Sequence, residues 1–251
     1  MIRFRHVALL ALCLPACLAQ APPSSTEESG SRIWIGRHSE VEDYLRTAEC
    51  VTMDVLKPNR ATRCTLRPGG PVARMAWRQI PPGLDRGFWQ SYKSEIAAYE
   101  LDKLLTMDMV PPTVERQLQG ANGAAQLWVE EVVDAADPAS PGEEKRAHWE
   151  SQLIRMTMFD NLIGNRDRNR RNMLRDGSWN LMLIDHTRAF GTGAELPHEL
   201  KRIDAGYWAK IESLTRNQLD AALQAWLEPD RIEAILARRE RMRAEITRLP
   251  R

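Results

Sequence analysis

Apolar residues recur at helical spacing through most of the second half of the chain, and two of these segments begin with helix-start signals. Thr215 is followed three residues later by Gln218, which is a capping-box pattern, and Pro229 suits the first turn of the next segment. The pattern predicts helices over residues 143–163, 215–227 and 230–249. One short β pattern interrupts them. Met173-Leu174-Arg175 and Leu181-Met182-Leu183-Ile184 lie on either side of Asp176-Gly177-Ser178, which favours a tight turn and predicts a hairpin.

The first half of the chain alternates short apolar runs with turn residues, a pattern typical of strands. Two turn-prone stretches, Lys57-Pro58-Asn59 and Pro68-Gly69-Gly70-Pro71, separate the first of these runs. Strands are therefore expected within residues 49–56, 61–67 and 72–80. Two more strands, at 110–114 and 126–133, are expected to flank the turn-prone stretch Ala121-Asn122-Gly123.

Two helices are expected in the same half. Ser39 with Glu42 is a capping-box pattern that would start a short helix over residues 39–48. The stronger pattern runs from Phe88 to Leu105, where apolar residues recur near the helical period. Residues 39–134 are therefore predicted to form a small α+β lobe with one main helix.

Segments of low apolar content divide the chain into parts. Residues 135–142 are rich in Asp, Ala, Ser and Pro, and are predicted to link the first lobe to a mostly helical lobe over 143–251. A Pro-, Ser- and Glu-rich run that is too polar to fold predicts a tether over 22–38. The expected fold class is α+β, with a small β-rich N-lobe and a helical C-lobe.

Residues 1–21 have the pattern of a secretory signal peptide. Arg3 and Arg5 precede the apolar run Val7–Leu18, and small residues suited to cleavage follow as far as Ala21. We therefore expect export, to the periplasm or to an anchored position in the envelope. Leu14-Pro15-Ala16-Cys17 also resembles a bacterial lipobox, although Pro15 fits it poorly. Plain cleavage and a membrane tether through a lipidated Cys17 both stay open.

The composition is that of an ordinary globular protein, with 43% hydrophobic and 27% charged residues. It excludes a mainly disordered, collagen-like or polytopic membrane protein. Lys and Arg total 35 against 34 for Asp and Glu, so no charge excess argues for a nucleic-acid partner. The 4 cysteines form no CxxC pair, and a structural zinc site is not expected. Cys50 and Cys64 flank a predicted hairpin, and are either joined in a disulfide or two separate buried thiols.

Polar residues gather after the end of the helix over 143–163. Asp167 and Asn172 lie in the loop, and the predicted hairpin can bring Asp185, at its far end, back beside them. Oxygen ligands of this kind suit Mg²⁺ or Mn²⁺. The interval from Asp167 to Asn172 is that of a kinase catalytic loop, in which one Asp orients the acceptor hydroxyl while an Asn and a second Asp hold metal ions.

Simpler interpretations compete with a metal site. Asp and Asn in a loop after a helix are commonly caps and turn residues. An EF-hand calcium loop starting at Asp167 is excluded, because its sixth position is Asn172 rather than Gly and its twelfth is Ser178 rather than Glu. Binding of single-stranded nucleic acid favours aromatic residues interleaved with basic ones, and the arginines of this loop have no aromatic residue among them.

Two stretches carry a family resemblance. The run from Ile163 to Asn172 followed by Leu183-Ile184-Asp185-His186 resembles the atypical kinases, a group with the phosphatidylinositol 3-/4-kinases, the HipA-type kinases and the secretory-pathway casein-kinase-type enzymes. The segment from Ser91 to Tyr99, followed by Val110-Pro111-Pro112-Thr113, resembles the helix and strand of that group's N-lobe. The likeness is greatest to an exported bacterial branch.

The resemblance implies roles for five residues. Asp167 would be the catalytic Asp, and Asn172 and Asp185 the ligands of Mg²⁺ or Mn²⁺. Glu95 would be the helix glutamate that pairs with a lysine on the preceding strand, but Arg78 stands in that position. We expect Arg78 and Glu95 to form a bidentate pair and to contact the nucleotide.

The resemblance also implies the activity. The first hypothesis is an exported kinase that transfers the γ-phosphate of ATP to a hydroxyl of a protein, lipid or small molecule. Arg78 in place of Lys, and Asn169 where related kinases have His, favour an alternative, a pseudokinase that serves as a nucleotide- or partner-binding envelope lipoprotein. A third hypothesis is a structural envelope lipoprotein without a nucleotide.

Overall fold

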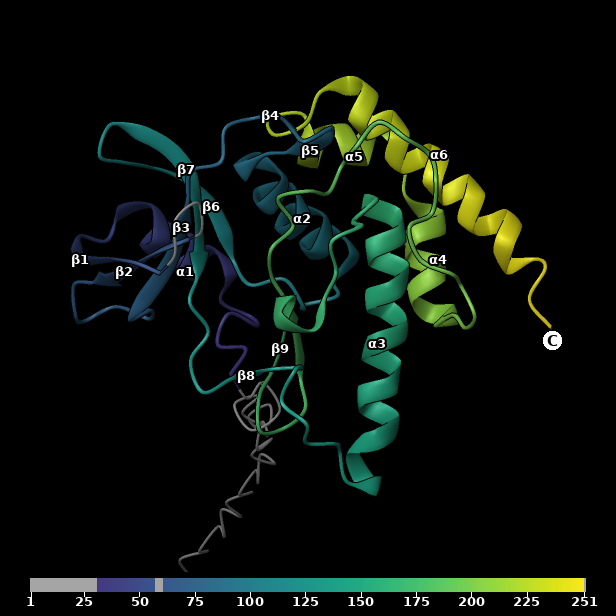
Figure 1. The fold of residues 1–251 in the computed structure, drawn as a ribbon, viewed down its shortest axis with the longest axis horizontal. Helices are drawn as coiled ribbons and strands as arrows, with labels where there is room; N and C mark the ends of the chain where they lie inside the picture. Colours follow the sequence, from purple (N-terminus) through teal and green to yellow (C-terminus); the bar gives the residue numbers. More distant parts are fainter. Residues whose placement is uncertain (1–30, 57–60, 251) are drawn as a thin grey trace, which may run out of the picture.

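The computed structural model describes residues 31–56 and 61–250, so the predicted signal peptide and Cys17 lie outside the described residues. Strands dominate the first half and helices the second (Figure 1). The helices are α1 (His38–Thr47), α2 (Tyr92–Leu105), α3 (Glu143–Ile163), α4 (Ala205–Ser213), α5 (Arg216–Leu223) and α6 (Pro229–Ile246). The strands are β1 (Cys50–Val55), β2 (Thr62–Leu66), β3 (Arg74–Arg78), β4 (Gly83–Asp85), β5 (Phe88–Gln90), β6 (Thr113–Leu118), β7 (Ala121–Leu127), β8 (Val133–Asp134), β9 (Met173–Arg175) and β10 (Leu181–Leu183).

Five antiparallel strands form the main sheet, in the order β1-β2-β3-β7-β6. Met75 and Trp77 of β3 share a buried core with Val41 and Leu45 of α1. Because side chains alternate between the two faces of a strand, Arg78 points to the face opposite Trp77. The sheet therefore packs on α1 with one face and offers Arg78 on the other.

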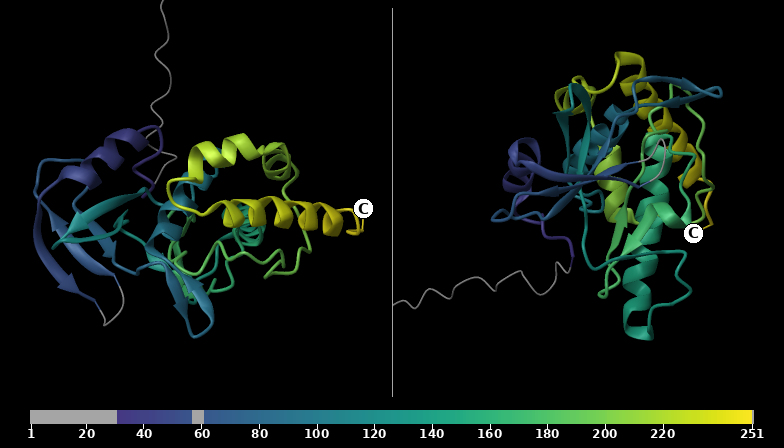
Figure 2. Two further views of the ribbon diagram at one scale, coloured as in Figure 1. Left: turned by 90° about the horizontal axis from the view of Figure 1, so that it is seen from above. Right: turned by 60° about the vertical axis from the view of Figure 1, so that its left-hand side comes forward.

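The second half forms a helical lobe that lies beside the sheet (Figure 2). Its core is built from fully buried residues of several helices, such as Phe159 and Leu162 of α3, Leu219 of α5 and Ile235 of α6. Leu101 of α2 belongs to the same core, so α2 joins the two lobes. The hairpin β9–β10 pairs Leu181 with Arg175, and β8 adds a third strand. None of the helices within residues 31–56 and 61–250 is long and apolar enough to cross a membrane.

Several predicted elements are confirmed. The helix over 143–163 has the predicted bounds and ends at Gly164, whose φ of 66° is left-handed. Thr215 and Gln218 form the capping box of α5. The hairpin across Asp176-Gly177-Ser178 is also present.

Other predicted elements need correction. α2 begins at Tyr92 rather than Phe88, because residues 88–90 pair with 83–85 as a small hairpin, and Ser91 caps the helix by accepting from the Lys93 N–H at 3.0 Å. The turn between β6 and β7 lies at Gln119 and Gly120, which both have positive φ, and not at 121–123. In α1 the N-cap position is Arg37, so Ser39 does not cap it. Helix α4 was not predicted.

The predicted tether over 22–38 is wrong for its described part. Trp34 is fully buried, in one core with residues of α1 and the sheet. The Ser31 N–H donates to Asp176 Oδ2 at 3.1 Å, and Arg32 Nη2 donates to Asn180 Oδ1 at 2.9 Å. One buried indole and two hydrogen bonds to the β9–β10 turn therefore hold a segment whose composition indicated a mobile linker.

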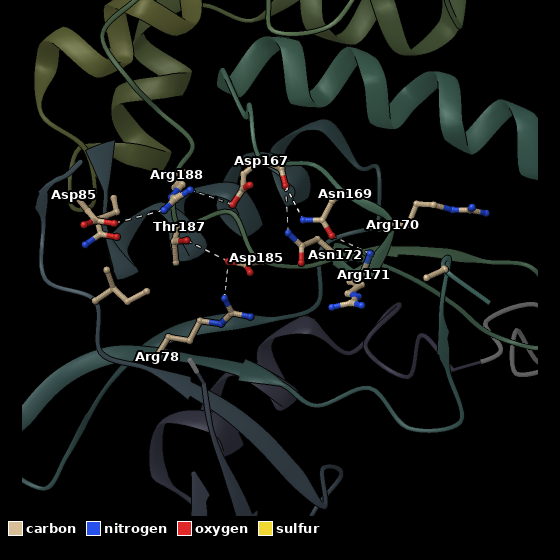
Figure 3. Close-up of a pocket in the computed structure, with 13 residues that line it drawn as sticks. Arg78, Asp85, Asp167, Asn169, Arg170, Arg171, Asn172, Asp185, Thr187 and Arg188 are labelled. Carbon is tan, nitrogen blue, oxygen red and sulfur yellow. Dashed lines mark hydrogen bonds and ion pairs between the residues drawn. The ribbon is translucent and has the colours of Figure 1, made fainter. Parts of the chain in front are cut away.

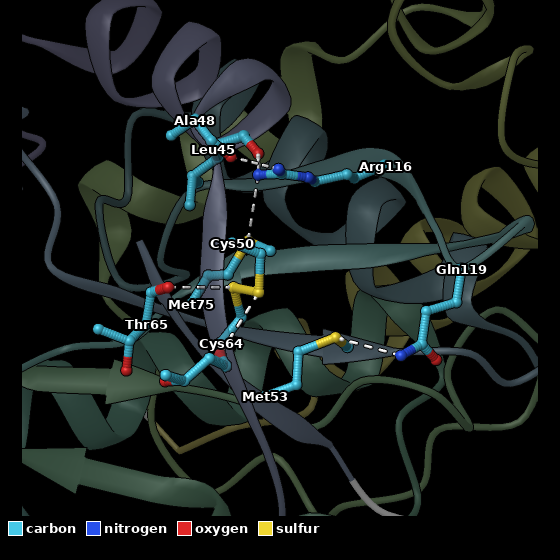
Figure 4. The surroundings of a disulfide bond; sticks show 10 residues. Leu45, Ala48, Cys50, Met53, Cys64, Thr65, Met75, Arg116 and Gln119 are labelled. Atoms are coloured by element: carbon cyan, nitrogen blue, oxygen red, sulfur yellow. Dashed lines mark hydrogen bonds between the residues drawn. A yellow bond between two sulfur atoms is a disulfide. The ribbon is translucent and has the colours of Figure 1, made fainter. Parts of the chain in front are cut away.

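Cys50 and Cys64 form a disulfide between β1 and β2, with their Cα atoms 5.8 Å apart (Figure 4). The disulfide alternative is therefore confirmed over separate thiols. Arg116 of β6 fixes α1 above the same region, because Nη1 donates to the Leu45 carbonyl at 2.7 Å and Nη2 donates to the Ala48 carbonyl. These contacts tie β1 to β2 and α1 to β6 on either side of β3.

Candidate active site

A cavity of about 720 Å³ lies between the sheet and the helical lobe (Figure 3). Its lining is mostly polar, and its charged residues are Arg78, Asp85, Asp167, Arg170, Arg171, Asp185 and Arg188. Asn172 lines the same cavity. The candidate catalytic and metal-binding residues named from the sequence thus reach one space.

The loop after α3 positions Asp167 and Asn172. The side-chain nitrogens of Asn169 and Asn172 both donate to the Asp167 carbonyl, at 3.1 Å and 3.3 Å. Asn165 Oδ1 accepts from the Asp167 N–H at 3.2 Å. Amides of the loop therefore hold the backbone of Asp167 from both sides, and the Asp167 side chain extends into the cavity.

Asp185 follows β10 and has a φ of 63°, a left-handed conformation that is uncommon for residues other than glycine. Of the described non-glycine residues with positive φ, Asp185 is the one that lines this cavity. Thr187 Oγ1 donates to Asp185 Oδ1 at 3.1 Å. The left-handed turn at Asp185 ends the strand direction and places the Asp185 carboxylate at the cavity.

Arg78 lies between two carboxylates. Its Nη1 atom is 2.6 Å from Asp185 Oδ1 and 3.3 Å from Glu95 Oε1. The Arg78–Glu95 ion pair expected from the sequence is present, but a single nitrogen makes it, so the expected bidentate geometry is wrong. The reason is Asp185, a closer partner of the same nitrogen that the sequence did not indicate.

Glu95 is 1% exposed and lies in the first turn of α2. Burial raises the pKa of Glu95, but the charge of Arg78 and contacts from His186 outweigh it and lower this pKa to about 2. The His186 N–H donates to Glu95 Oε2 at 2.9 Å. Glu95 is therefore an ionised, buried anchor for Arg78.

Sequence reasoning missed a second charged pair beneath the loop. Arg168 and Asp160 are almost fully buried, and Arg168 Nε lies 2.9 Å from Asp160 Oδ2. Arg168 Nη2 also contacts His186 Nε2 at 2.8 Å. Two signals in the sequence could have found it: Asp160 is a carboxylate within the apolar end of a helix, which requires a cationic partner when buried, and Arg168 follows Asp167 in the stretch that resembles the atypical kinases.

Arg188 is a further side chain at the mouth that was not predicted. Its guanidinium lies 3.5 Å from Asp85 Oδ2 and 3.9 Å from Asp167 Oδ2. Asp85 belongs to β4, so the β4–β5 hairpin borders the cavity on the side of Asp167. Arg188 thus places a positive charge beside the candidate catalytic carboxylate.

The donor set of the cavity fits Mg²⁺ or Mn²⁺. Asp185 offers a carboxylate, and Asn172 offers its amide oxygen because the amide nitrogen is engaged with Asp167. Two oxygen donors leave the other coordination positions of the ion open for phosphate oxygens and water, which usually complete the shell of Mg²⁺. Within the described residues no group of three or more His, Cys, Asp or Glu side chains is placed to hold a metal ion.

A second cavity of about 500 Å³ adjoins the first and shares Arg78, Arg171, Asn172 and Asp185 with it. Its remaining lining is more apolar and comes from both lobes, with Ala76, Leu127, Val129, Leu174 and Ile184 among the residues. An apolar slot beside a polar, charged cavity can take a flat aromatic group on one side and phosphates on the other.

No protein-family model matches the chain, and no curated protein matches its sequence. Solved structures are similar in fold. A Golgi casein kinase aligns over 84% of this chain and 75% of its own, with a TM-score of 0.60 and 12% identity. Hydra Fam20, determined with sugar, aligns over 84% of this chain and 88% of its own, with a TM-score of 0.62 and 17% identity. The Helicobacter pylori proinflammatory kinase CtkA aligns over 80% and 93%, with a TM-score of 0.52 and 11% identity.

These structural neighbours show the fold class. The chain has an atypical kinase-like fold of two lobes, a β-rich lobe with α2 and a mostly helical lobe, as the sequence predicted. The Golgi casein kinase has also been determined with Mn and ADP bound, and that structure aligns with a TM-score of 0.57 and 12% identity over 84% of this chain and 74% of its own.

Proposed function

We propose that this protein is a phosphotransferase that moves the γ-phosphate of a nucleoside triphosphate, ATP by preference, to a hydroxyl group. The observation that carries the proposal is that Asp167, Asn172 and Asp185 line one cavity although they come from a loop and from the end of a hairpin. A kinase-like fold with these residue types at this place supports phosphoryl transfer.

The residues divide the chemistry between them. Asp167 is proposed to orient the acceptor hydroxyl and to accept its proton. Asn172 and Asp185 would hold Mg²⁺ or Mn²⁺, which when bound neutralises charge on the phosphates. The Mn- and ADP-bound state of the Golgi casein kinase supports this choice of ion and nucleotide.

The two cavities fit the two ends of a nucleotide. The apolar slot beside Ala76 and Ile184 would hold the base, and the polar cavity would hold the phosphates. Arg78 is mostly buried, with 15% of its side chain exposed, and lies between Glu95 and Asp185, so it is proposed to fix α2 and Asp185 against each other and to contact phosphate. Its fixed fork has less freedom to reach phosphates than a lysine, which suggests slow turnover.

We propose an oxidising compartment outside the cytoplasm as the place of action. The Cys50–Cys64 disulfide supports it, because disulfides persist mainly in oxidising compartments, and so does the signal-like pattern of residues 1–21. The acceptor would be a protein, lipid or small molecule of that compartment.

Thermal shift and calorimetry with ADP, with and without Mn²⁺, test nucleotide binding by the full chain. Asp185→Ala should abolish the Mn²⁺-dependent part of the ADP affinity. Asp167→Ala should keep binding and stop transfer of labelled phosphate from ATP, measured as autophosphorylation or on added acceptors. Asp43→Ala, at an exposed position of α1, is the matched control.

Two results would contradict the proposal. Equal ADP affinity of wild type and Asp185→Ala in the presence of Mn²⁺ would remove the metal site. Binding of Mn²⁺ and ADP without transfer to any acceptor, in wild type as in Asp167→Ala, would instead identify a nucleotide-binding pseudokinase.

A further inference from the structure

The Arg168 guanidinium is almost fully buried beneath the candidate catalytic loop, and only 4% of its side chain is exposed. All five of its N–H donors have a partner. Nε and Nη2 bind the two carboxylate oxygens of Asp160 at 2.9 Å and 3.0 Å, and Nη2 also contacts His186 Nε2 at 2.8 Å. Nη1 donates to the carbonyls of Asn172 at 2.7 Å and Ile184 at 2.9 Å.

The two carbonyls bound by Nη1 lie next to the candidate metal ligands. One is the carbonyl of Asn172 itself, and the other is that of Ile184, whose peptide bond leads directly into Asp185. The Ile184 N–H also donates to the Asn172 carbonyl at 3.1 Å, so Arg168 Nη1 braces a backbone contact that already joins the loop to the end of the hairpin. The spacing of these two backbones sets the spacing of the Asn172 and Asp185 side chains.

Asp160 and His186 both contact Nη2 of Arg168 and together orient the guanidinium. Asp160 binds Arg168 in a bidentate pair from α3, and the Asn165 Nδ2 atom donates to Asp160 at 2.8 Å. Since a guanidinium can only donate, His186 Nε2 must be the acceptor, and the ring proton lies on Nδ1, which is 3.6 Å from Glu95 Oε2.

These contacts close a ring around the site. Arg168 holds the peptide before Asp185, Asp185 contacts Arg78, and Arg78 contacts Glu95. Glu95 accepts a hydrogen bond from the His186 backbone N–H, and the His186 ring contacts Arg168, which closes the ring. Asp185 is thereby held through its side chain from the sheet and through its backbone from the helical lobe.

We propose that Arg168 is a positioning residue, which sets the distance between the candidate metal ligands Asn172 and Asp185 for binding of a metal–nucleotide complex. The inference rests on the function proposed above. Lysine cannot replace Arg168, because one ammonium has three donors and no planar fork to meet Asp160, both carbonyls and His186 together.

The test compares the ADP affinity of wild type and Arg168→Lys with and without Mn²⁺, by calorimetry, beside the melting temperature of each protein. In wild type, Mn²⁺ should raise the ADP affinity. In Arg168→Lys that gain should fall by about tenfold, the lower end of the effect of losing a partner that orients metal ligands, while the affinity for ADP alone changes by less than about twofold. Arg166→Lys, an exposed arginine of the same loop, should match wild type.

Other results separate the inference from its alternatives. A wild-type gain from Mn²⁺ that persists in Arg168→Lys would overturn the inference alone. Equal losses of ADP affinity with and without Mn²⁺, together with a lower melting temperature, would show a merely structural arginine and also overturn it. If Mn²⁺ does not change the ADP affinity of the wild-type protein, the proposed function is overturned, and the inference with it.

Asp160→Asn provides a second variant if Arg168→Lys does not fold. It keeps Arg168 and the shape of its partner but removes the charge that orients the guanidinium. The same selective loss of the Mn²⁺ gain is expected, in a smaller amount. A gain equal to that of wild type in folded Asp160→Asn would contradict the inference.

Discussion

The Arg78 Nη1 atom lies 2.6 Å from Asp185 Oδ1, closer than the 3.3 Å to Glu95 Oε1. The last residue of β3 is therefore bound both to the helix glutamate and to the candidate metal ligand. A lysine at position 78, whose ammonium is compact and mobile, would divide its contacts differently among Glu95, Asp185 and phosphates.

Arg78→Lys should increase the rate of phosphoryl transfer, because the ammonium can leave Asp185 and approach phosphate. Its charge is retained, so the free energy of unfolding should change by less than about 1.5 kcal/mol. Transfer rates from labelled ATP and denaturant unfolding of both proteins measure these effects. A transfer rate below that of wild type would show that the arginine is adapted to this site.

Arg78→Ala should destabilise the protein by about 3 kcal/mol, because it leaves Glu95 buried without its cation. The matched control is Arg74→Ala on the same strand, where Arg74 pairs with the partly exposed Glu130 and the loss should be at most about 1 kcal/mol. Urea unfolding measures both variants. Equal losses in the two would mean that burial of the Arg78–Glu95 pair contributes nothing.

The lowered pKa of Glu95 predicts a dependence of stability on pH. Its ordinary pKa of 4.5 falls to about 2 in the folded protein, so the ionised carboxylate stabilises the fold above pH 4.5, and this contribution is lost as the pH falls toward 2. Glu95→Gln should therefore be less stable than wild type at pH 7, with a difference that shrinks below pH 4.5. Unfolding at a series of pH values measures it, and a difference independent of pH would contradict the ion pair.

The disulfide between Cys50 and Cys64 should stabilise the protein by about 3 kcal/mol, since it closes a loop of about 15 residues in the unfolded chain. The double variant Cys50→Ser, Cys64→Ser should lose that amount in urea unfolding. Addition of a reductant should destabilise wild type and leave the double variant unchanged. Peptide mapping without reductant that recovers both cysteines as free thiols would contradict the bond.

Trp34→Ala should destabilise the fold by about 3–5 kcal/mol, because the indole is fully buried in the core of the sheet. Ile33→Ala, at an exposed position beside it, should cost less than about 0.5 kcal/mol. Thermal and urea unfolding compare the two variants. Equal stability of Trp34→Ala and wild type would restore the interpretation of this segment as a tether.

Local patterns predicted the parts of the fold that depend on local interactions. The helix over 143–163 is long, with a glycine at its end, and the hairpin after it has a turn signal, so both could be found in the sequence. The start of α2 was mistaken because the apolar residues Phe88 and Trp89 fit a helical pattern as well as a strand. Only pairing with residues 83–85 decides between the two, and pairing is a tertiary interaction.

The candidate site divides in the same way. Asp167, Asn172 and Asp185 lie in a short stretch with a characteristic spacing, which made them visible. Asp160 and Arg168 have no such spacing. Their pairing follows from the burial of both side chains, which cannot be read from a single sequence. The contact between Arg78 and Asp185 joins residues 107 positions apart and had no sequence signal.

The left-handed backbone conformation of Asp185 lowers the stability of the fold at a residue whose carboxylate the proposed chemistry needs. Glycine adopts a φ of 63° without steric cost, whereas an L-residue with a side chain loses roughly 1–2 kcal/mol there. Glycine at 185 would relieve that strain and remove a carboxylate that lines the cavity together with Asn172. Glycine would also leave Arg78 without its closest carboxylate, so the relief of strain and the loss of that contact oppose each other in thermal stability, whereas selection for nucleotide binding should retain the aspartate.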